Sequence, residues 1–233
     1  IIFPLSFYDS PSGYGGSLFN DFYEWLLFIL KLSSKTNYDW YIKLHPDVLL
    51  KWDYLNYSIV KNLLKKYKNV KWIEPHVTHN QIIKEGINAA LTIHGTVGSE
   101  YPYFNIPVVN ASKNNPHMAY KFNYHPQNIK ELEKIILNLP KMKKKIERKE
   151  ILEFFFMHHL LPKYDWLGID MKELVKKTKN LKLFYSSINT YHSIAQKVNE
   201  EELLQSLKAF LNTDNYILEK NYDIKTNYKE IYK

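Results

Sequence analysis

Three short segments combine glycine, histidine, lysine or hydroxyl side chains in patterns that could bind a phosphate group. The first runs from Tyr8 to Ser17 and holds Gly13, Gly15 and Gly16 just before a helical stretch. Glycines allow backbone amides to approach an anion closely, and the start of a helix favours negative charge. Because the spacing matches neither a Walker loop nor the dinucleotide-binding fingerprint, the segment can equally be a plain flexible loop.

The second segment is Lys43-Leu44-His45-Pro46, at the end of a strand-like run. His45 can donate a hydrogen bond to a phosphate oxygen, Pro46 would end the strand and fix the turn, and Lys43 adds positive charge. Strand alternation puts Lys43 and His45 on one face, if the strand extends that far. A histidine at a strand end is also often a structural residue with satisfied hydrogen bonds, so both interpretations stay open.

The third segment passes from a strand through a turn of small residues directly into a helix: His94, Gly95, Thr96, Val97, Gly98, Ser99 and Glu100. Thr96 is the predicted N-cap, and a well-capped helix without any ligand would explain these residues. In the functional interpretation, the amides of Gly95, Thr96 and Val97 and the Thr96 hydroxyl bind a phosphate. Glu100, one turn into the helix, could then bind ribose hydroxyls.

Histidines elsewhere are weak candidates for metal ligands. His117 and His125 flank an aromatic loop after the last predicted strand, and His158 and His159 are adjacent. No carboxylate accompanies either pair at helical spacing. The chain has no cysteine, which excludes thiolate metal sites and cysteine nucleophiles and favours a reducing compartment. We therefore expect no metal site.

The elements that must position these segments alternate between β-rich and helical patterns. Strands are predicted at residues 1–7, 39–44, 70–73, 89–93 and 106–110, and helices at 17–33, 54–67, 78–86, 97–104 and 128–139. Pro102 could cut the fourth helix short. This alternation predicts an α/β fold with a doubly wound parallel sheet, in which ligands bind at the carboxyl ends of the strands. The three segments lie at those ends.

The pattern divides the chain into two domains. Residues 1–140 form the predicted Rossmann-like domain, and residues 141–233 a helical C-terminal extension. In the extension, residues 141–150 are predicted to form a charged helical face, residues 152–161 are aromatic and apolar, and the helical pattern continues to about Leu211. The tail from Asn215 lacks apolar periodicity, and we expect it to fray.

Composition excludes several classes of protein. The chain of 233 residues is 45% hydrophobic and 24% charged, as expected for a globular protein with a sizeable core. The net charge of +8 is spread over both halves, so a nucleic-acid-binding arm is not supported, whereas acidic ligands or an anionic membrane surface stay open. No apolar run is long enough to span a bilayer. Without an initiator methionine or a signal-peptide pattern, we expect a piece of a longer chain.

Taken together, these motifs carry a resemblance to a known family. Lys-x-His-Pro at 43–46, His-Gly-Thr-Val-Gly-Ser-Glu at 94–100 and Ile-Pro-Val-Val at 106–109 resemble the nucleotide-binding C-terminal domain of GT-B glycosyltransferases. The likeness is strongest to bacterial capsule and surface-polysaccharide transferases, and it includes residues 18–26 and 115–126. It covers roughly residues 1 to 160.

The resemblance implies a donor-binding half of a GT-B enzyme. The His-Pro pair is similar to one in bacterial sialyltransferases, Kdo transferases and the polyol-phosphate polymerases of teichoic acid synthesis, which use CMP- or CDP-activated donors. The implied catalytic residue is His45, on the nucleotide phosphate. The implied substrate-binding residues are Lys43, Pro46, Gly13, Gly15, Gly16, His94, Gly95, Thr96, Val97, Gly98, Ser99, Glu100 and His117.

The resemblance also implies partners and a location. The nucleotide-activated sugar is a substrate, so no cofactor is expected, and a glycan or lipid-linked acceptor would bind an N-terminal part of the enzyme. The implied location is cytoplasmic, with peripheral contact with the inner membrane surface left open. The Asp-Tyr-Ser-Ser motif of the teichoic-type enzymes is absent, which favours a sugar over glycerol phosphate. A polyol-phosphate transferase, a nucleotide-sugar epimerase of the same fold and a non-catalytic nucleotide- or glycan-binding module remain alternatives.

Overall fold

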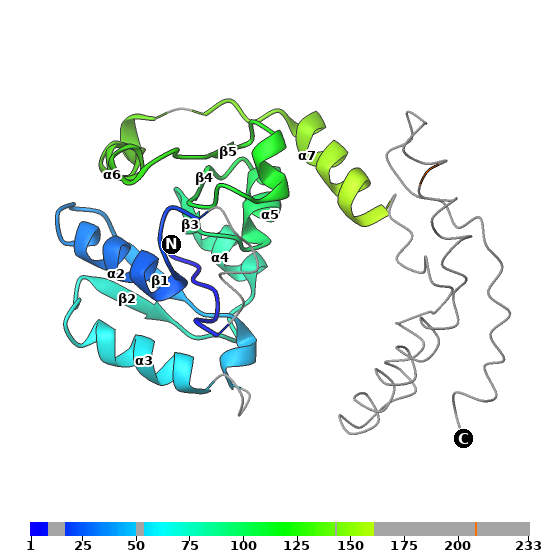
Figure 1. Ribbon diagram of the computed structural model, residues 1–233. Coiled ribbons are helices and arrows are strands. Elements are labelled where there is room, and N and C mark those ends of the chain that lie inside the picture. The colour runs from blue at the N-terminus through cyan, green and yellow to red at the C-terminus, as the bar shows by residue number, and fades with distance from the viewer. Residues whose placement is uncertain (9–16, 50–53, 143, 161–207, 209–233) are drawn as a thin grey trace, which may run out of the picture. The chain divides into compact units, whose positions relative to one another are not determined.

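The computed structural model describes residues 1–8, 17–49, 54–142, 144–160 and 208 (Figure 1). Gly13, Gly15 and Gly16 lie outside the described residues, as does most of the predicted C-terminal extension, including its helices up to Leu211 and its tail. The chain divides into a compact unit, Ile1–Phe155, and a second unit, Phe156–Lys233. Within the second unit, Phe156–Leu160 form a π-helical turn.

The strands of the described residues in the first unit pair in parallel. Strand β1 (Trp40–Lys43) pairs with β2 (Val70–Ile73), and β3 (Ala90–Thr92), β4 (Val108–Asn110) and β5 (Asn123–Tyr124) pair in that order. The first residues join the two sets, because Ile2 forms parallel bridges with Ile42 of β1 and Leu91 of β3. The order across the sheet is therefore β2, β1, the N-terminal segment, β3, β4 and β5. The predicted α/β fold is confirmed.

Helices cover both faces of this parallel arrangement. They are α2 (Phe22–Ser33), α3 (Tyr54–Leu64), α4 (His79–Glu85), α5 (Val97–Tyr103), α6 (Ile129–Leu137) and α7 (Arg148–Phe155). Leu91 and Val109 pack in a core with α2, α3 and α6, whereas Ala90 and Val108 pack in another with α4 and α5. Alternation along buried strands thus separates two hydrophobic layers. In Figure 1, α5 lies beside β3 and β4.

Helix boundaries follow local capping. The predicted helix at 17–33 begins only at Phe22, because the Asp21 carboxylate accepts a hydrogen bond from the Glu24 amide and Ser17 forms an antiparallel bridge with Ser112. A capping box between Thr78 and Gln81 starts α4. Gly86 ends α4 with a φ of 84°, which favours glycine.

One prediction about the later elements is wrong, and one strand was not predicted. Residues 141–150 do not form one helix: a 3-10 turn, Leu139–Lys141, contains Pro140, and α7 begins at Arg148. Helix α7 belongs to the first unit, where Ile151 and Phe154 pack against Phe122. The strand that the sequence pattern did not predict is β5, since two residues are too few to display alternation.

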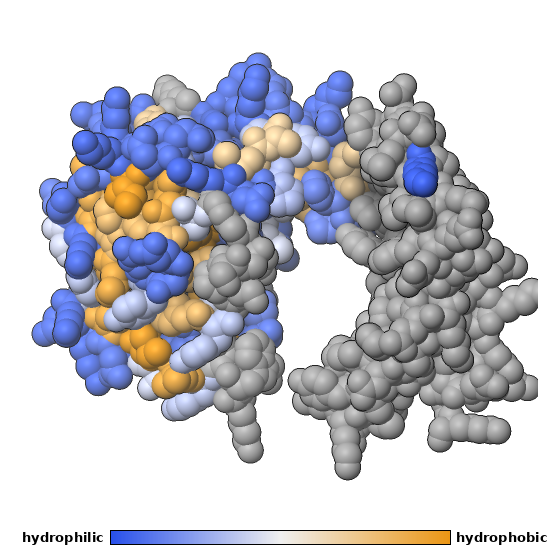
Figure 2. All heavy atoms as spheres, in the orientation of Figure 1, coloured by the Kyte–Doolittle hydropathy of each residue, from blue (hydrophilic) through white to orange (hydrophobic). Residues whose placement is uncertain are grey.

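Two further features concern the surface of the molecule and the length of its helices. In Figure 2, hydrophobic side chains gather around α2 on the face in view, and hydrophilic side chains surround them. Within the described ranges, no helix has both the length and the apolar composition that a membrane crossing requires.

Candidate functional site

The carboxyl ends of the parallel strands bring four loops to one edge of the sheet. The segment after β1 includes Lys43 to Asp47, and the segment after β2 leads to His79. The segment after β3 includes His94 to Glu100, and the segment after β4 includes Ser112 to His117. In parallel α/β sheets this edge is the usual place for a ligand. The predicted site residues within the described part of the chain all lie in or beside these loops, but they divide into three groups with different surroundings.

The first group centres on Lys43, a buried cation. The residue is only 3% exposed, and its ammonium donates one long hydrogen bond, 3.3 Å, to the Leu44 carbonyl oxygen. Among the described residues, no carboxylate lies within ion-pair distance of it. Burial lowers the pKa of Lys43. An ammonium has three donors, so Lys43 retains the capacity to bind an anion that enters this edge.

His79 and Tyr101 form a hydrogen-bonded pair near Lys43. Nδ1 of His79 lies 2.8 Å from the hydroxyl oxygen of Tyr101, which is fully buried. The His79 ring also packs against the rings of Phe3 and Tyr101, both at 5.5 Å. Burial lowers the pKa of His79, the charges of Lys43 and His45 lower it further, and Glu100 raises it. Burial and the Glu100 charge both raise the pKa of Tyr101.

The sequence analysis did not single out His79 or Tyr101. A signal was present, because the Thr78 capping box makes His79 the first residue of a helix that follows a strand end. Without the strand order, nothing indicated that this strand end adjoins that of Lys43.

His45 lies at the solvent side of the same group. Its side chain is 68% exposed, and its Nδ1 accepts a hydrogen bond of 3.2 Å from the Asp47 amide. When the ring is neutral, this bond places its proton on Nε2, which has no acceptor among the described residues. The Asp47 carboxylate lies 3.4 Å from the same Nδ1. Pro46, also exposed, begins a 3-10 turn, Pro46–Leu49, directly after the strand end.

The loop after β3 leads into α5 with Thr96 at the N-cap, as expected, but without a side-chain cap bond. Thr96 occupies the N-cap position of α5, but its hydroxyl makes no cap bond, so the predicted side-chain cap is wrong. The backbone adopts helical angles at Thr96, φ −59° and ψ −22°, instead of the extended angles that let a side chain reach back. The amides of Thr96 and Val97 have no acceptor within the described residues. Ser99 donates its hydroxyl to the Thr96 carbonyl at 3.0 Å.

Gly95 is required by the packing of this loop. Its amide donates to the hydroxyl of Thr92 at 3.0 Å, and a Cβ at position 95 would lie 2.7 Å from that oxygen. The close approach fixes the turn that leads into α5. Glu100, half-buried in the first turn of α5, faces the pair of His79 and Tyr101 closely enough to influence both pKa values.

The second group is a hydrogen-bond network around His94. Its Nε2 lies 2.8 Å from the Ser112 hydroxyl, and its Nδ1 lies 3.3 Å from Nδ2 of Asn115. Because Oδ1 of Asn115 accepts from the His117 amide, Nδ2 must face His94, and Nδ1 of His94 is an acceptor. This network ties the loop after β3 to the loop after β4.

The third group is the buried surrounding of His117. This residue is 4% exposed, its ring packs against Phe154 at 4.7 Å, and its Nδ1 lies 3.3 Å from Nδ2 of Asn110. A Cβ at Gly98 would lie 2.6 Å from the same Nδ1. The structure therefore places His117 against Gly98 of α5.

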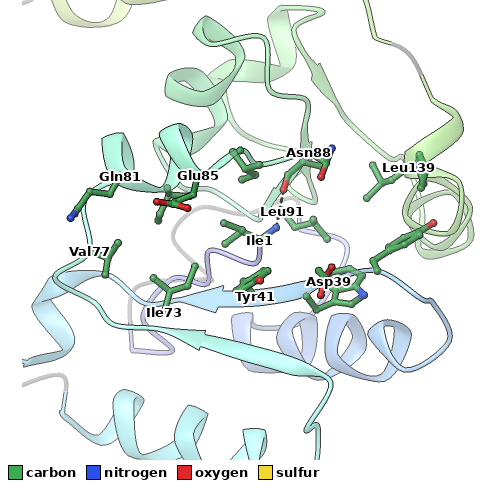
Figure 3. A pocket seen from close by; sticks show the side chains of 17 residues that line it. Ile1, Asp39, Tyr41, Ile73, Val77, Gln81, Glu85, Asn88, Leu91 and Leu139 are labelled. Carbon is green, nitrogen blue, oxygen red and sulfur yellow. Dashed lines mark hydrogen bonds between the residues drawn. The ribbon is translucent and has the colours of Figure 1, made fainter.

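A hollow of about 940 Å³ lies at the opposite edge of the sheet (Figure 3). It is lined near the amino ends of the strands by Asp39, Tyr41 and Ala89, and by Gln81 and Glu85 of α4. None of the predicted site residues lines it.

Metal ligands and known relatives give no further guidance. Among the residues described, no three histidine, aspartate or glutamate side chains gather as a metal site would need. Comparison of the chain with models of protein families, with characterised proteins and with solved structures found no match.

Proposed function

We propose that this chain is the donor-binding part of a glycosyltransferase that uses a CMP- or CDP-activated sugar to build a bacterial surface polysaccharide. The observation that carries the proposal is the buried ammonium of Lys43 at the carboxyl edge of the sheet, which has no ion-pair partner in the described part of the chain. A phosphate would supply the counter-charge that this cation lacks among the described residues.

The strand order supports the same place for the ligand. The order β2, β1, N-terminal segment, β3, β4, β5 has the pattern of doubly wound, Rossmann-like nucleotide-binding sheets. The chain adds strands on one side of the N-terminal segment as far as β2, and from β3 onward it adds them on the other side. This reversal in the order of the strands lies between the N-terminal segment and β3. Ligands of such sheets bind outside the carboxyl ends at this reversal. Lys43 and the loop after β3 flank it.

The chemistry requires stabilisation of a leaving nucleotide. As the sugar departs, negative charge grows on the oxygen that joined it to the phosphate, and fixed donors lower the barrier. Here the donors would be Nε2–H of His45, the Lys43 ammonium and the amides of Thr96 and Val97. Glu100 would accept hydrogen bonds from the ribose, and the acceptor would be a glycan or a lipid-linked glycan at the cytoplasmic face of the membrane. One such donor is worth about 2.7–4 kcal/mol in comparable sites.

Two measurements test the proposal. Calorimetric titration of the chain with CMP, CDP, UDP and GDP should show a preference for the cytidine nucleotides; equal or stronger binding of GDP would refute the cytidine assignment. Incubation of the full-length enzyme with CMP-, CDP- and UDP-sugars should release nucleotide only when an acceptor is present. Product without acceptor would indicate an epimerase, and no release at all would indicate a binding module.

A further inference from the structure

The hydrogen bond between His79 and Tyr101 fixes the position of a proton. Tyr101 is fully buried, and in the described part of the chain its hydroxyl has one hydrogen-bond partner, Nδ1 of His79 at 2.8 Å. If Nδ1 carried the proton, the phenolic O–H would have no acceptor, and a buried donor without a partner is costly. The hydroxyl therefore donates to Nδ1, and the neutral imidazole carries its proton on Nε2.

The surroundings favour the neutral ring over the imidazolium. Lys43, His45, Glu100 and Tyr101 are the titratable groups that face His79, and the phenyl ring of Phe3 packs beside it. The positive charge of Lys43, and that of His45 when its ring is protonated, oppose a positive charge on the His79 ring, while Glu100 favours it. Nε2–H is left without a hydrogen-bond partner among the described residues.

We infer that His79 is a further anion-binding residue of this edge, a neutral donor whose tautomer and orientation are fixed by Tyr101. The inference rests on the proposed function, since the anion would be the donor phosphate held by Lys43. His79 binds the anion through Nε2–H, and Tyr101 is a positioning residue that does not touch it. A fixed, neutral donor loses little orientational freedom on binding and adds no further positive charge beside Lys43.

Nuclear magnetic resonance tests the proton position directly. Long-range ¹H–¹⁵N spectra of the histidine rings at pH 7 should show His79, identified with H79Q, with a protonated Nε2 and an unprotonated Nδ1. Inorganic pyrophosphate, compared with sodium chloride of equal ionic strength, should shift the Nε2–H signal of His79 and leave His76 unchanged. His76 is the matched control because it is exposed and lies three residues earlier. A His79 ring protonated on Nδ1 alone, or one that pyrophosphate does not affect, overturns the inference.

Calorimetry with pyrophosphate tests the binding roles. His79→Ala should weaken binding about tenfold or more, as expected for a hydrogen bond to a charged group, and His79→Gln should restore part of it. Tyr101→Phe should weaken binding less and let both ring tautomers of His79 appear. His76→Ala should bind as the parent does. Unchanged binding in His79→Ala overturns the inference.

The two proposals can fail separately. If His79→Ala loses pyrophosphate binding but cytidine nucleotides bind no better than pyrophosphate, the anion-binding role stands and the proposed function fails. If CDP binds the parent and His79→Ala equally well, the proposed function stands and the role of His79 fails.

Discussion

At the scale of single residues, Lys43 shows how a binding site can oppose stability. Removing an ammonium from water costs several kcal/mol unless an opposite charge and hydrogen bonds replace the hydration, and Lys43 retains one long bond to a carbonyl oxygen. The lowered pKa of Lys43 reports the same cost. A methionine would fill the same space with an unbranched apolar chain and need no counter-charge.

We therefore predict that Lys43→Met leaves the free energy of unfolding unchanged or raises it by about 1 kcal/mol, while CDP affinity falls at least about tenfold. Urea unfolding and calorimetry on the same preparation measure both. The matched control is Lys71→Met on the neighbouring strand, where the exposed ammonium pairs with Asp39 at 2.8 Å; it should retain CDP binding. A loss of stability in Lys43→Met with unchanged affinity would make Lys43 a structural residue.

His45 offers the opposite case, an exposed donor whose removal costs the fold little. We predict that His45→Ala lowers transfer by the full-length enzyme about a hundredfold or more, as for the loss of one donor to a developing oxyanion. The thermal midpoint should change only slightly, because the side chain is 68% exposed. A midpoint drop typical of a core truncation, with unchanged activity per folded molecule, would establish the structural interpretation.

At the scale of elements, the sequence predicts the helix and strand boundaries that are determined by neighbouring residues. The capping residues Thr78 and Gly86 define α4, and the predicted strand at 70–73 matches β2 at both ends. Asn128 caps α6 by accepting from the Glu131 amide at 2.9 Å. The failures occur where tertiary packing decides. Strand β5 exists because two residues pair with β4, and of the charged stretch at 141–150 only the last three residues are α-helical, as the start of α7, whose Ile151 and Phe154 pack against Phe122.

The contact between α5 and His117 illustrates a role that spacing alone cannot reveal. The family resemblance implies that Gly98 binds the substrate, and the structure shows a packing role for the same residue: Gly98 leaves room for the ring of His117, with a Cβ position only 2.6 Å from Nδ1. The neighbouring Asn110 amide, 3.3 Å from the same position, leaves little room for adjustment. A methyl group there must displace the ring or the helix.

We predict that Gly98→Ala lowers the free energy of unfolding by about 1–3 kcal/mol, the usual cost of overpacking. The cost should largely disappear in a His117→Ala background, because the alanine methyl then enters space that the ring has left. A double-mutant cycle by urea unfolding measures this coupling. Additive effects of the two substitutions would mean that the close contact does not set the cost.

At the scale of the whole molecule, the site depends on the order of the strands. Lys43 ends β1, whereas His79 and Glu100 lie in the helices that follow β2 and β3. The three residues meet because the N-terminal segment lies between β1 and β3. The alternation of β-rich and helical runs predicted the α/β fold, and in the structure Leu91 and Ala90 pack in two different cores. It could not predict which strands are neighbours, because pairing within a parallel sheet depends on contacts far apart in the sequence.

At the scale of the whole fold, the dependence of the free energy of unfolding on acidic pH involves a histidine beside β5, His125. His125 is half-buried, its Nε2 lies 3.1 Å from the His117 carbonyl oxygen, and its Nδ1 is buried without a partner among the described residues. Burial lowers the pKa of His125 to about 4, the Lys144 charge adds to this, and the bond to the carbonyl opposes it. In the unfolded chain the pKa returns to about 6.5.

Between these values the unfolded chain binds a proton that the folded chain does not. We therefore predict that the free energy of unfolding falls as the pH drops from about 6.5 to about 4, with His125 contributing up to about 1.4 kcal/mol per pH unit. The lowered pKa of His79 acts in the same direction. Urea unfolding at several pH values measures the slope, and His125→Gln, which keeps a donor for the His117 carbonyl but does not titrate, should make it shallower. His76→Gln, at an exposed position, should retain the slope of the parent. If His125→Gln retains that slope too, His125 is protonated in the folded chain at these pH values, and other groups cause the acid sensitivity.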